Sequence, residues 1–175
     1  MKSIDIIAGA RPNFIKIAPI IKSIEKKRMS SNSSFGYRLI HTGQHYDKKM
    51  SSDFFTQLDI PSPDINLNVG SGTQAQQTAA IMVSYEKILI DKPTDLCLVV
   101  GDVNSTAACS IAAKKLGISV AHVEAGIRSG DNSMPEEINR IITDSITDYF
   151  FTTSTYANKN LKKIGVNDEN IFFVG

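Results

Sequence analysis

Residues 96–100 read LCLVV, five apolar side chains in succession, and this run constrains the fold more than any other feature of the sequence. A strand with one face in water alternates apolar and polar residues, whereas a strand buried on both faces of a parallel sheet does not. Further strand-like runs alternate along the chain with helical patterns, at residues 3–8, 37–42, 65–69, 119–123, 149–153 and 171–174. Such alternation predicts an α/β fold, a doubly wound parallel sheet with helices on both faces.

The helical patterns between these runs are amphipathic or rich in alanine. In the first, Pro12 occupies a position where its missing N–H is not needed, so a helix can begin there. Ile17, Ile20 and Ile21 follow at helical spacing and predict one buried stripe. Further helices are predicted at residues 47–57, 73–90, 105–116, 135–145 and 155–164.

Composition and charge exclude several classes of protein. The 175 residues carry 19 basic and 18 acidic side chains, a formal net charge of +1, which leaves no electrostatic footprint for nucleic acid or an anionic membrane. No apolar run reaches the length of a membrane span, and the first residues lead directly into a strand without a signal peptide. We expect a single cytoplasmic domain with its own core, in which Cys97 and Cys109 are buried, reduced thiols.

Ligands of doubly wound sheets bind beyond the carboxyl ends of the strands, so the turn after each strand is informative. After the first strand come Gly9, Arg11 and Pro12, with Lys16 one turn into the helix. A glycine turn, a helix N-terminus and two cations suit a phosphate group. An ordinary strand–helix turn with two solvated cations fits equally well. Because the turn is neither GxGxxG nor GxxxxGK(S/T), it indicates neither NAD nor a P-loop nucleotide.

The second strand ends near His41 and is followed by Gln44 and His45. Gln44 and His45 lie where they can hydrogen-bond a ligand at the same edge of the sheet. His41 is still within the strand, and we interpret it as a core histidine whose hydrogen bonds are satisfied.

Two carboxylates end the fourth and fifth strands. Asp102 follows the fourth strand, and the alternative to a functional role is that it caps the helix that opens near Ser105. Glu124 ends the fifth strand, where a carboxylate is costly unless it has a partner or a task. The alternative for Glu124 is a structural ion pair with Arg128, four residues on.

A third carboxylate, Glu136, lies at the start of the helix predicted at residues 135–145. Taken alone, Ser133 and Glu136 form a capping box, which satisfies the first N–H groups of a helix. Convergence with Asp102 and Glu124 on one rim favours a functional interpretation instead. Grouped carboxylates in a cleft have pKa values that are pushed apart, as general acid–base chemistry on a sugar requires. The sequence contains no CxxC, HExxH or histidine-cluster metal motif and no GxSxG nucleophile.

Taken together, these segments resemble the non-hydrolysing UDP-N-acetylglucosamine 2-epimerases. The match runs in the same order along essentially the whole chain, through GARP (9–12), IKIAP (15–19), TGQH (42–45), GD (101–102), HVEAGIRS (122–129) and PEEINR (135–140). The resemblance implies a Rossmann-like domain, the first of two in the glycosyltransferase-B arrangement, with the active site between them. Residues 1–175 correspond to that first domain. The second domain, which carries much of the uridine pocket and a catalytic histidine in the family, is not in this sequence.

The resemblance also implies that Asp102, Glu124 and Glu136 are the catalytic carboxylates. In the family reaction UDP leaves anti across C1–C2 through an oxocarbenium-like transition state, while a carboxylate removes the C2 proton and a 2-acetamidoglucal forms. UDP then returns, and C2 is protonated on the opposite face. Glu124 and Glu136 are the acid/base candidates, and Asp102 is a base or an electrostatic stabiliser. No cofactor or metal is required.

For binding, the resemblance implies that Arg11 and Lys16 contact the nucleotide. We add His45 and Arg128 to the predicted substrate- and UDP-binding residues. Gln44 matches a residue that binds a second, activating UDP-sugar in some members. The expected partners are UDP-N-acetylglucosamine and UDP, with neither nucleic acid nor membrane. The full-length enzyme is expected to be a cytoplasmic homodimer that serves polysaccharide synthesis, and this fragment alone is expected to be inactive.

Three other functions fit the same residues. A hydrolysing epimerase would release UDP and free N-acetylmannosamine. A glycosyltransferase of the same arrangement would pass the sugar to an acceptor without forming a glucal. A stand-alone sugar-nucleotide-binding domain would bind UDP and perform no chemistry.

Overall fold

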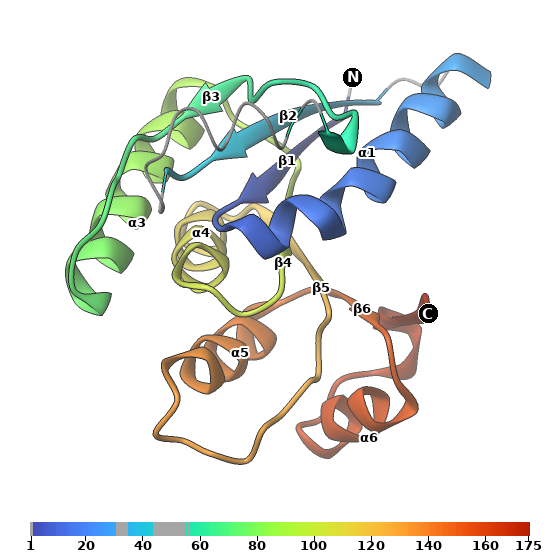
Figure 1. The fold of residues 1–175 in the computed structure, drawn as a ribbon. Helices are drawn as coiled ribbons and strands as arrows, with labels where there is room; N and C mark the ends of the chain where they lie inside the picture. The colour runs from blue at the N-terminus through green and yellow to red at the C-terminus, as the bar shows by residue number, and fades with distance from the viewer. Residues whose placement is uncertain (1, 31–34, 44–54, 56) are drawn as a thin grey trace.

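A computed structural model of the chain describes residues 2–30, 35–43, 55 and 57–175 (Figure 1). Its strands are β1 (Lys2–Ala8), β2 (Phe35–His41), β3 (Ile65–Asn66), β4 (Leu96–Val100), β5 (Ser119–Val123), β6 (Tyr149–Thr152) and β7 (Ile171–Phe173). Its helices are α1 (Arg11–Ser30), α3 (Gln74–Asp91), α4 (Asn104–Lys115), α5 (Pro135–Ile146) and α6 (Thr155–Lys163), with a 3₁₀ turn at Asp168–Asn170. The predicted alternation of strands and helices is confirmed.

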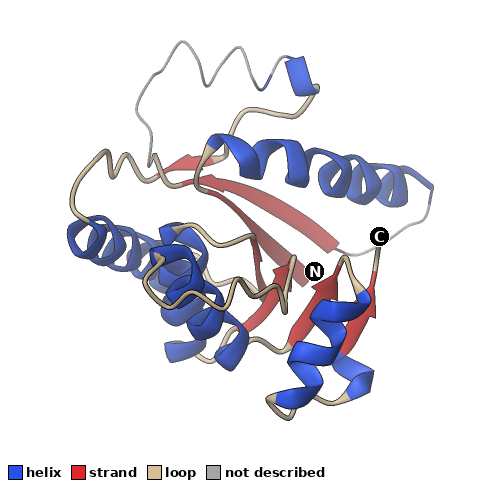
Figure 2. Ribbon diagram, turned by 60° about the horizontal axis from the view of Figure 1, so that its bottom comes forward, coloured by secondary structure: helices blue, strands red, loops and turns tan. Residues whose placement is uncertain are grey.

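The strands form one parallel sheet in the order β3-β2-β1-β4-β5-β6-β7, so the predicted doubly wound architecture is confirmed (Figure 2). The order reverses between β1 and β4, which are direct neighbours: Ile4 pairs with Leu96 and Ile6 with Leu98. β5 lies on the other side of β4. In sheets of this kind the crevice beyond the carboxyl ends of the strands at the reversal is where ligands bind.

Successive side chains of a strand point to opposite faces, and the helices divide the core accordingly. Ile6 packs with Ile17 and Ile21 of α1, both of them fully buried. Ile7, one residue on, packs in a separate cluster with Tyr85 of α3. Figures 1 and 2 show α1 on one side of the sheet and α3 and α4 on the other. The helical stripe predicted from isoleucine spacing is therefore the one that α1 buries.

Two local details differ from expectation. β3 contains two residues instead of five, because Asn68 takes a left-handed φ of +52°, which interrupts the extended backbone soon after Asn66. α1 begins at Arg11, one residue before Pro12. The α3 start is well defined, since Thr73 and Gln76 form a capping box in which each side chain bonds the other residue's backbone.

Cys97 and Cys109 are free and fully buried, as predicted. Burial raises the pKa of the Cys97 thiol to about 12, so it is a packing group rather than a nucleophile. The helix predicted at residues 47–57 falls almost wholly outside the described residues. Among the helices that the structure describes, none combines the length and the apolar character needed to cross a membrane.

Candidate active site

One asparagine holds the turn between β1 and α1. The Oδ1 atom of Asn13 accepts hydrogen bonds from the N–H groups of Gly9, at 3.2 Å, and Ala10, at 2.9 Å. Its Nδ2 donates to the carbonyl oxygen of Val100 at 2.9 Å. Because Val100 ends β4, Asn13 ties together the two strand ends at the reversal of strand order.

Lys16 and Glu124 meet beside this turn. The Nζ atom of Lys16 is 2.5 Å from Oε2 of Glu124, and the two side chains keep 35% and 25% of their exposure, so a ligand can reach both. A Cβ placed on Gly101 would lie 3.5 Å from that Nζ and 3.6 Å from that Oε2, so the pair sits over the end of β4. Glu124 has a φ of +68°, a left-handed conformation that costs a non-glycine residue about 1–2 kcal/mol.

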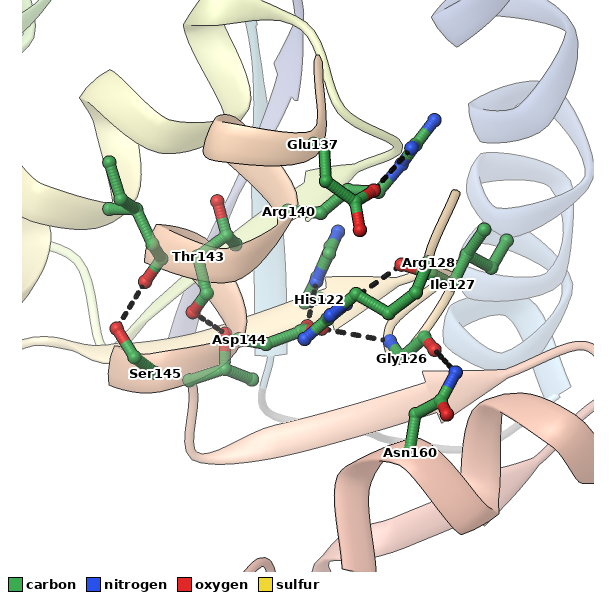
Figure 3. A network of polar contacts seen from close by, with 12 residues as sticks. His122, Gly126, Ile127, Arg128, Glu137, Arg140, Thr143, Asp144, Ser145 and Asn160 are labelled. Carbon is green, nitrogen blue, oxygen red and sulfur yellow. Dashed lines mark hydrogen bonds and ion pairs between the residues drawn. The ribbon is translucent and has the colours of Figure 1, made fainter. Parts of the chain in front are cut away.

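The alternative pairing of Glu124 with Arg128 is wrong. Nη1 of Arg128 lies 2.6 Å from Oδ2 of Asp144 in α5, and it also donates to the carbonyl oxygen of Ile127 at 2.7 Å (Figure 3). The left-handed backbone at Glu124 directs its carboxylate to Lys16 instead.

Asp102 does not cap α4. The N-cap of α4 is Val103, and no side chain bonds the free N–H groups there. Instead, Arg140 of α5 forms ion pairs with Asp102 through Nη2 and with Glu137 through Nη1, the latter at 2.8 Å. Asn139 donates from Nδ2 to the backbone carbonyl of Asp102 at 2.9 Å. Asp102 is thus anchored to α5 through both its side chain and its backbone.

Glu137 is the buried acid at the start of α5, with 2% of its surface exposed. Its carboxylate accepts the N–H groups of Ser129, at 2.9 Å, and Gly130, at 3.3 Å, as well as the guanidinium of Arg140. Burial alone would raise the pKa of Glu137, but these donors outweigh it and lower the pKa to about 2. Glu137 is therefore ionised, and it fixes the loop between β5 and α5.

Glu136, the preceding residue, is placed differently. The capping box considered for Ser133 and Glu136 does not form: the N-cap of α5 is Met134, and the hydroxyl of Ser133 donates to Asp131 at 2.6 Å. Glu136 is half-buried and makes no hydrogen bond or ion pair with the described residues. It occupies the first turn of the helix that also anchors Asp102.

Three predicted binding residues lie partly or wholly outside the described structure. Gln44 and His45 fall within residues 44–54, and the side chain of Arg11, at the first position of α1, is also outside it. His41 is 5% exposed and packs against Phe14 with ring centroids 5.4 Å apart. Burial lowers the pKa of His41, which is a core histidine as predicted.

A buried polar network joins β5 to α5 beneath the loop (Figure 3). Nδ1 of His122 is 2.7 Å from Oδ1 of Asp144, and Nε2 of His122 is 2.8 Å from the carbonyl oxygen of Gly101. The other oxygen of Asp144 accepts the N–H of Gly126 at 3.0 Å and the guanidinium of Arg128. Burial would raise the pKa of Asp144, but His122 and Arg128 outweigh it and lower that pKa.

The described residues therefore combine an accessible cation with two accessible carboxylates at the ends of neighbouring strands. Lys16 and Glu124 are in contact, and Asp102 follows the adjoining strand. Such a set can hold an anion and transfer a proton. Over the part of the chain that the structure describes, no group of three or more His, Cys, Asp or Glu side chains could hold a metal ion.

Comparison with known proteins identifies the family. A family model described as UDP-N-acetylglucosamine 2-epimerase matches residues 27–175. The chain belongs to the UDP-N-acetylglucosamine 2-epimerase family. A crystal structure of the family member from Methanocaldococcus jannaschii, in complex with UDP-GlcNAc and UDP, superposes with a TM-score of 0.92 at 44% identity. The superposed region is 99% of this chain and 46% of the Methanocaldococcus jannaschii chain. This likeness confirms the expected Rossmann-like fold, that of one half of the glycosyltransferase-B arrangement.

Two curated relatives are longer than this epimerase-family chain. The UDP-N-acetylglucosamine 2-epimerase of Methanocaldococcus jannaschii is 44% identical over 172 residues, which is 98% of this chain and 45% of the relative. The UDP-2,3-diacetamido-2,3-dideoxy-D-glucuronate 2-epimerase of Pseudomonas aeruginosa is 44% identical over 165 residues, or 94% of this chain and 45% of the relative. The chain thus spans less than half the length of the curated relatives it matches.

Sequence reasoning missed four residues that shape this site in the epimerase-family chain, namely Asn13, Glu137, Arg140 and Asp144. A signal for three of them was present, since residues 137, 140 and 144 recur at helical spacing and define one face of α5. A face made of two acids and an arginine looks solvent-exposed in a sequence, yet here both acids are buried and bond the loop after β5. Asn13 carried no comparable signal.

Proposed function

We propose that this chain forms the N-terminal half of a two-domain, non-hydrolysing epimerase that interconverts UDP-N-acetylglucosamine and UDP-N-acetylmannosamine. Membership of the family supports the substrate class, and the coverage of less than half of each relative supports the two-domain organisation. The chain would supply one wall of the active site, so we expect it to be inactive without the other wall.

The observation that carries the proposal is the Lys16–Glu124 ion pair at the reversal of strand order. A bound diphosphate competes with Glu124 for the ammonium group of Lys16. Once Lys16 has turned to the diphosphate, the carboxylate of Glu124 is free to accept a proton from the substrate. The left-handed backbone of Glu124 also supports a functional role, because strain of this kind concentrates at functional sites.

The proposed reaction has two half-reactions. In the first, the C1–O bond to UDP breaks, the C2 proton passes to a carboxylate, and a C1=C2 double bond forms in 2-acetamidoglucal. In the second, the UDP oxygen bonds C1 again, and a proton reaches C2 from the opposite face. Elimination and addition leave the overall oxidation state unchanged, so the route needs no redox cofactor.

Proton transfer on two faces of C2 calls for two groups, and Glu124 and Glu136 are our candidates. Asp102 is the third carboxylate, either a base or a stabiliser of positive charge at C1. Its ion pair with Arg140 supports the second role, because the guanidinium holds this carboxylate in a fixed place.

For the diphosphate, we propose Arg11 and Lys16, in the first and second turns of α1. Gln44 and His45 complete the proposed set on the β2 side. Arg128 uses Nη1 within the chain, and its other guanidinium nitrogens make no hydrogen bond to the described residues, which leaves them for a ligand.

The test joins this chain at Gly175 to the part of the Methanocaldococcus jannaschii relative that it does not match; we call this protein the fusion. In D2O, the fusion should incorporate deuterium at C2 of UDP-N-acetylglucosamine and produce UDP-N-acetylmannosamine, both observed by NMR. The chain alone should bind UDP without exchange.

Other outcomes separate the alternatives. Free N-acetylmannosamine would indicate a hydrolysing epimerase, and transfer only when an acceptor is added would indicate a glycosyltransferase. If the fusion, like the chain alone, binds UDP but incorporates no deuterium at C2, the chain is a sugar-nucleotide-binding domain. Because one relative is named for UDP-2,3-diacetamido-2,3-dideoxy-D-glucuronate, that sugar nucleotide is assayed in parallel. If deuterium enters C2 of that sugar nucleotide and not of UDP-N-acetylglucosamine, the proposed reaction stands and the proposed substrate is wrong.

A further inference from the structure

The ring of His122 has an acceptor on both sides. Nδ1 faces the carboxylate of Asp144 at 2.7 Å, and Nε2 faces the carbonyl oxygen of Gly101 at 2.8 Å. The ring of His122 thus lies between the Asp144 carboxylate and the Gly101 carbonyl and contacts one with each of its nitrogens. The ring is 1% exposed, so water does not substitute for either partner.

Asp144 is the matching anion. Its side chain is fully buried and receives His122, the N–H of Gly126 and the guanidinium of Arg128. His122 and Arg128 outweigh the effect of burial and lower the pKa of Asp144, so its carboxylate stays ionised. The His122–Asp144 pair is thus a buried salt bridge between β5 and α5, shown in Figure 3.

The salt bridge spans both turns that carry candidate catalytic carboxylates. His122 holds the carbonyl of Gly101, and the N–H of Gly101 bonds the carbonyl of Val123 at 3.0 Å, so the ends of β4 and β5 are joined twice. Asp102 follows Gly101 directly. On the other side, Asp144 holds residues 122, 126 and 128, which bracket Glu124.

Glu124 is the one residue in this bracket whose backbone is strained. Its φ of +68° is unfavourable for a glutamate, and such a conformation persists only when the surroundings fix it. The contacts of Asp144 with His122, Gly126 and Arg128, on either side of Glu124, provide that restraint. The φ value decides the direction of the side chain, so the restraint also keeps the carboxylate on Lys16.

We propose that the His122–Asp144 salt bridge is a positioning device, which holds the turns of Asp102 and Glu124 in register and keeps Glu124 in its left-handed conformation. Its consequence for catalysis rests on the epimerase function proposed above. Neither residue reaches the proposed substrate site, because both side chains are buried.

A first measurement needs no variant. With ¹⁵N-labelled histidine, the N–H signal of the His122 ring should be observed and should exchange slowly with water, because the ring is buried and held between Asp144 and Gly101. Fast exchange of the His122 ring N–H with water would show that the ring is not held there and would overturn the proposal, whatever the fate of the proposed function.

A second measurement uses Asp144→Asn, with Asp148→Asn as the matched control. Asp148 also pairs with a cation, Lys114 at 2.8 Å, and accepts a β5 backbone N–H, that of Val120 at 2.8 Å, but it acts at the other end of the strand. Backbone chemical shifts should show that Asp144→Asn moves Glu124 out of the left-handed region. Asp148→Asn should leave Glu124 there.

Activity of the fusion completes the test. Asp144→Asn should lower kcat by about a hundredfold with a much smaller change in KM, as expected when a reacting group is misplaced. Asp148→Asn should leave kcat unchanged. Unaltered Glu124 shifts and kcat in Asp144→Asn would reduce the salt bridge to a structural role. If Asp144→Asn does not fold, Arg128→Met removes one partner of Asp144 instead. The backbone chemical shifts of Glu124 should then indicate a negative φ. Shifts that still indicate a left-handed Glu124 would contradict the proposal.

Discussion

The Nζ atom of Lys16 and the Oε2 atom of Glu124 lie 2.5 Å apart, although 108 residues separate them along the chain. The pair is partly exposed, and ion pairs of that kind stabilise a fold by about 0–1 kcal/mol. The left-handed backbone of Glu124 costs about 1–2 kcal/mol, which is at least as much. Stability therefore does not account for this arrangement, which supports the role in binding and proton transfer that we propose for the pair.

Replacing Glu124 by glutamine tests that role. Glutamine keeps the shape of the side chain but does not accept a proton, so Glu124→Gln in the fusion should lower C2 deuterium exchange by about a hundredfold to ten-thousandfold. UDP binding should persist, because Lys16 is released from its ion pair. Glu86→Gln, on α3, is the control and should keep full exchange. Near-normal exchange in Glu124→Gln would remove Glu124 from the mechanism.

Lys16→Met tests the diphosphate contact. A charged hydrogen bond contributes about 1.5–3 kcal/mol, so the Kd of the fusion for UDP, measured by calorimetry, should rise by about tenfold or more. Lys22→Met removes the same charge from the same helix; Lys22 pairs with exposed Asp59 at 3.3 Å, away from the turn. Equal Kd values for the two variants would contradict a specific contact at Lys16.

The class of fold was predictable because the signals for it are local. Periodicity marks the buried stripe of α1, and the unbroken apolar run of β4 marks a strand buried on both faces. The carboxylates at the ends of β4 and β5 were predictable for a related reason, since parallel strands bring their carboxyl ends to one edge.

The pairing of these carboxylates was not predictable. The local assumption joined Glu124 to Arg128, but one left-handed residue turns the side chain away, and the partner comes from α1. Similarly, Glu136 and Glu137 are adjacent in the sequence, and only the packing of α5 decides which is buried. The left-handed backbone leaves no local signal, and the helical spacing of residues 137, 140 and 144 marks a face of α5 without indicating that this face is buried.

Glu137 should make stability depend on pH in a definite direction. Its pKa is lowered from 4.5 to about 2 in the folded chain, so the ionised carboxylate stabilises the fold above pH 4.5, and that contribution is lost as the pH falls toward 2. Glu137→Gln should cost about 3 kcal/mol at pH 7, measured by urea unfolding. The difference from the unsubstituted chain should shrink between pH 4.5 and the lowest pH at which both fold.

The control for this measurement is Glu169→Gln. Glu169 is exposed in the 3₁₀ turn, so its replacement should change stability by less than about 0.5 kcal/mol at every pH. A cost for Glu137→Gln that stays constant from pH 7 to pH 3 would show that its carboxylate is not held ionised by Ser129, Gly130 and Arg140.

Gly126 and Gly117 separate backbone strain from close packing. Both have left-handed φ, +78° and +74°, so alanine at either position incurs the same backbone penalty of about 1 kcal/mol. A Cβ at Gly117 would have no atom within 4 Å, whereas at Gly126 it would lie 2.5 Å from the carbonyl oxygen of Ala157 in α6. Gly126→Ala should therefore lower the free energy of unfolding by about 3 kcal/mol or more, and Gly117→Ala by about 1 kcal/mol, in urea titrations at one pH. Equal costs would mean that α6 does not pack against the loop after β5 as closely as its contact with Gly126 requires.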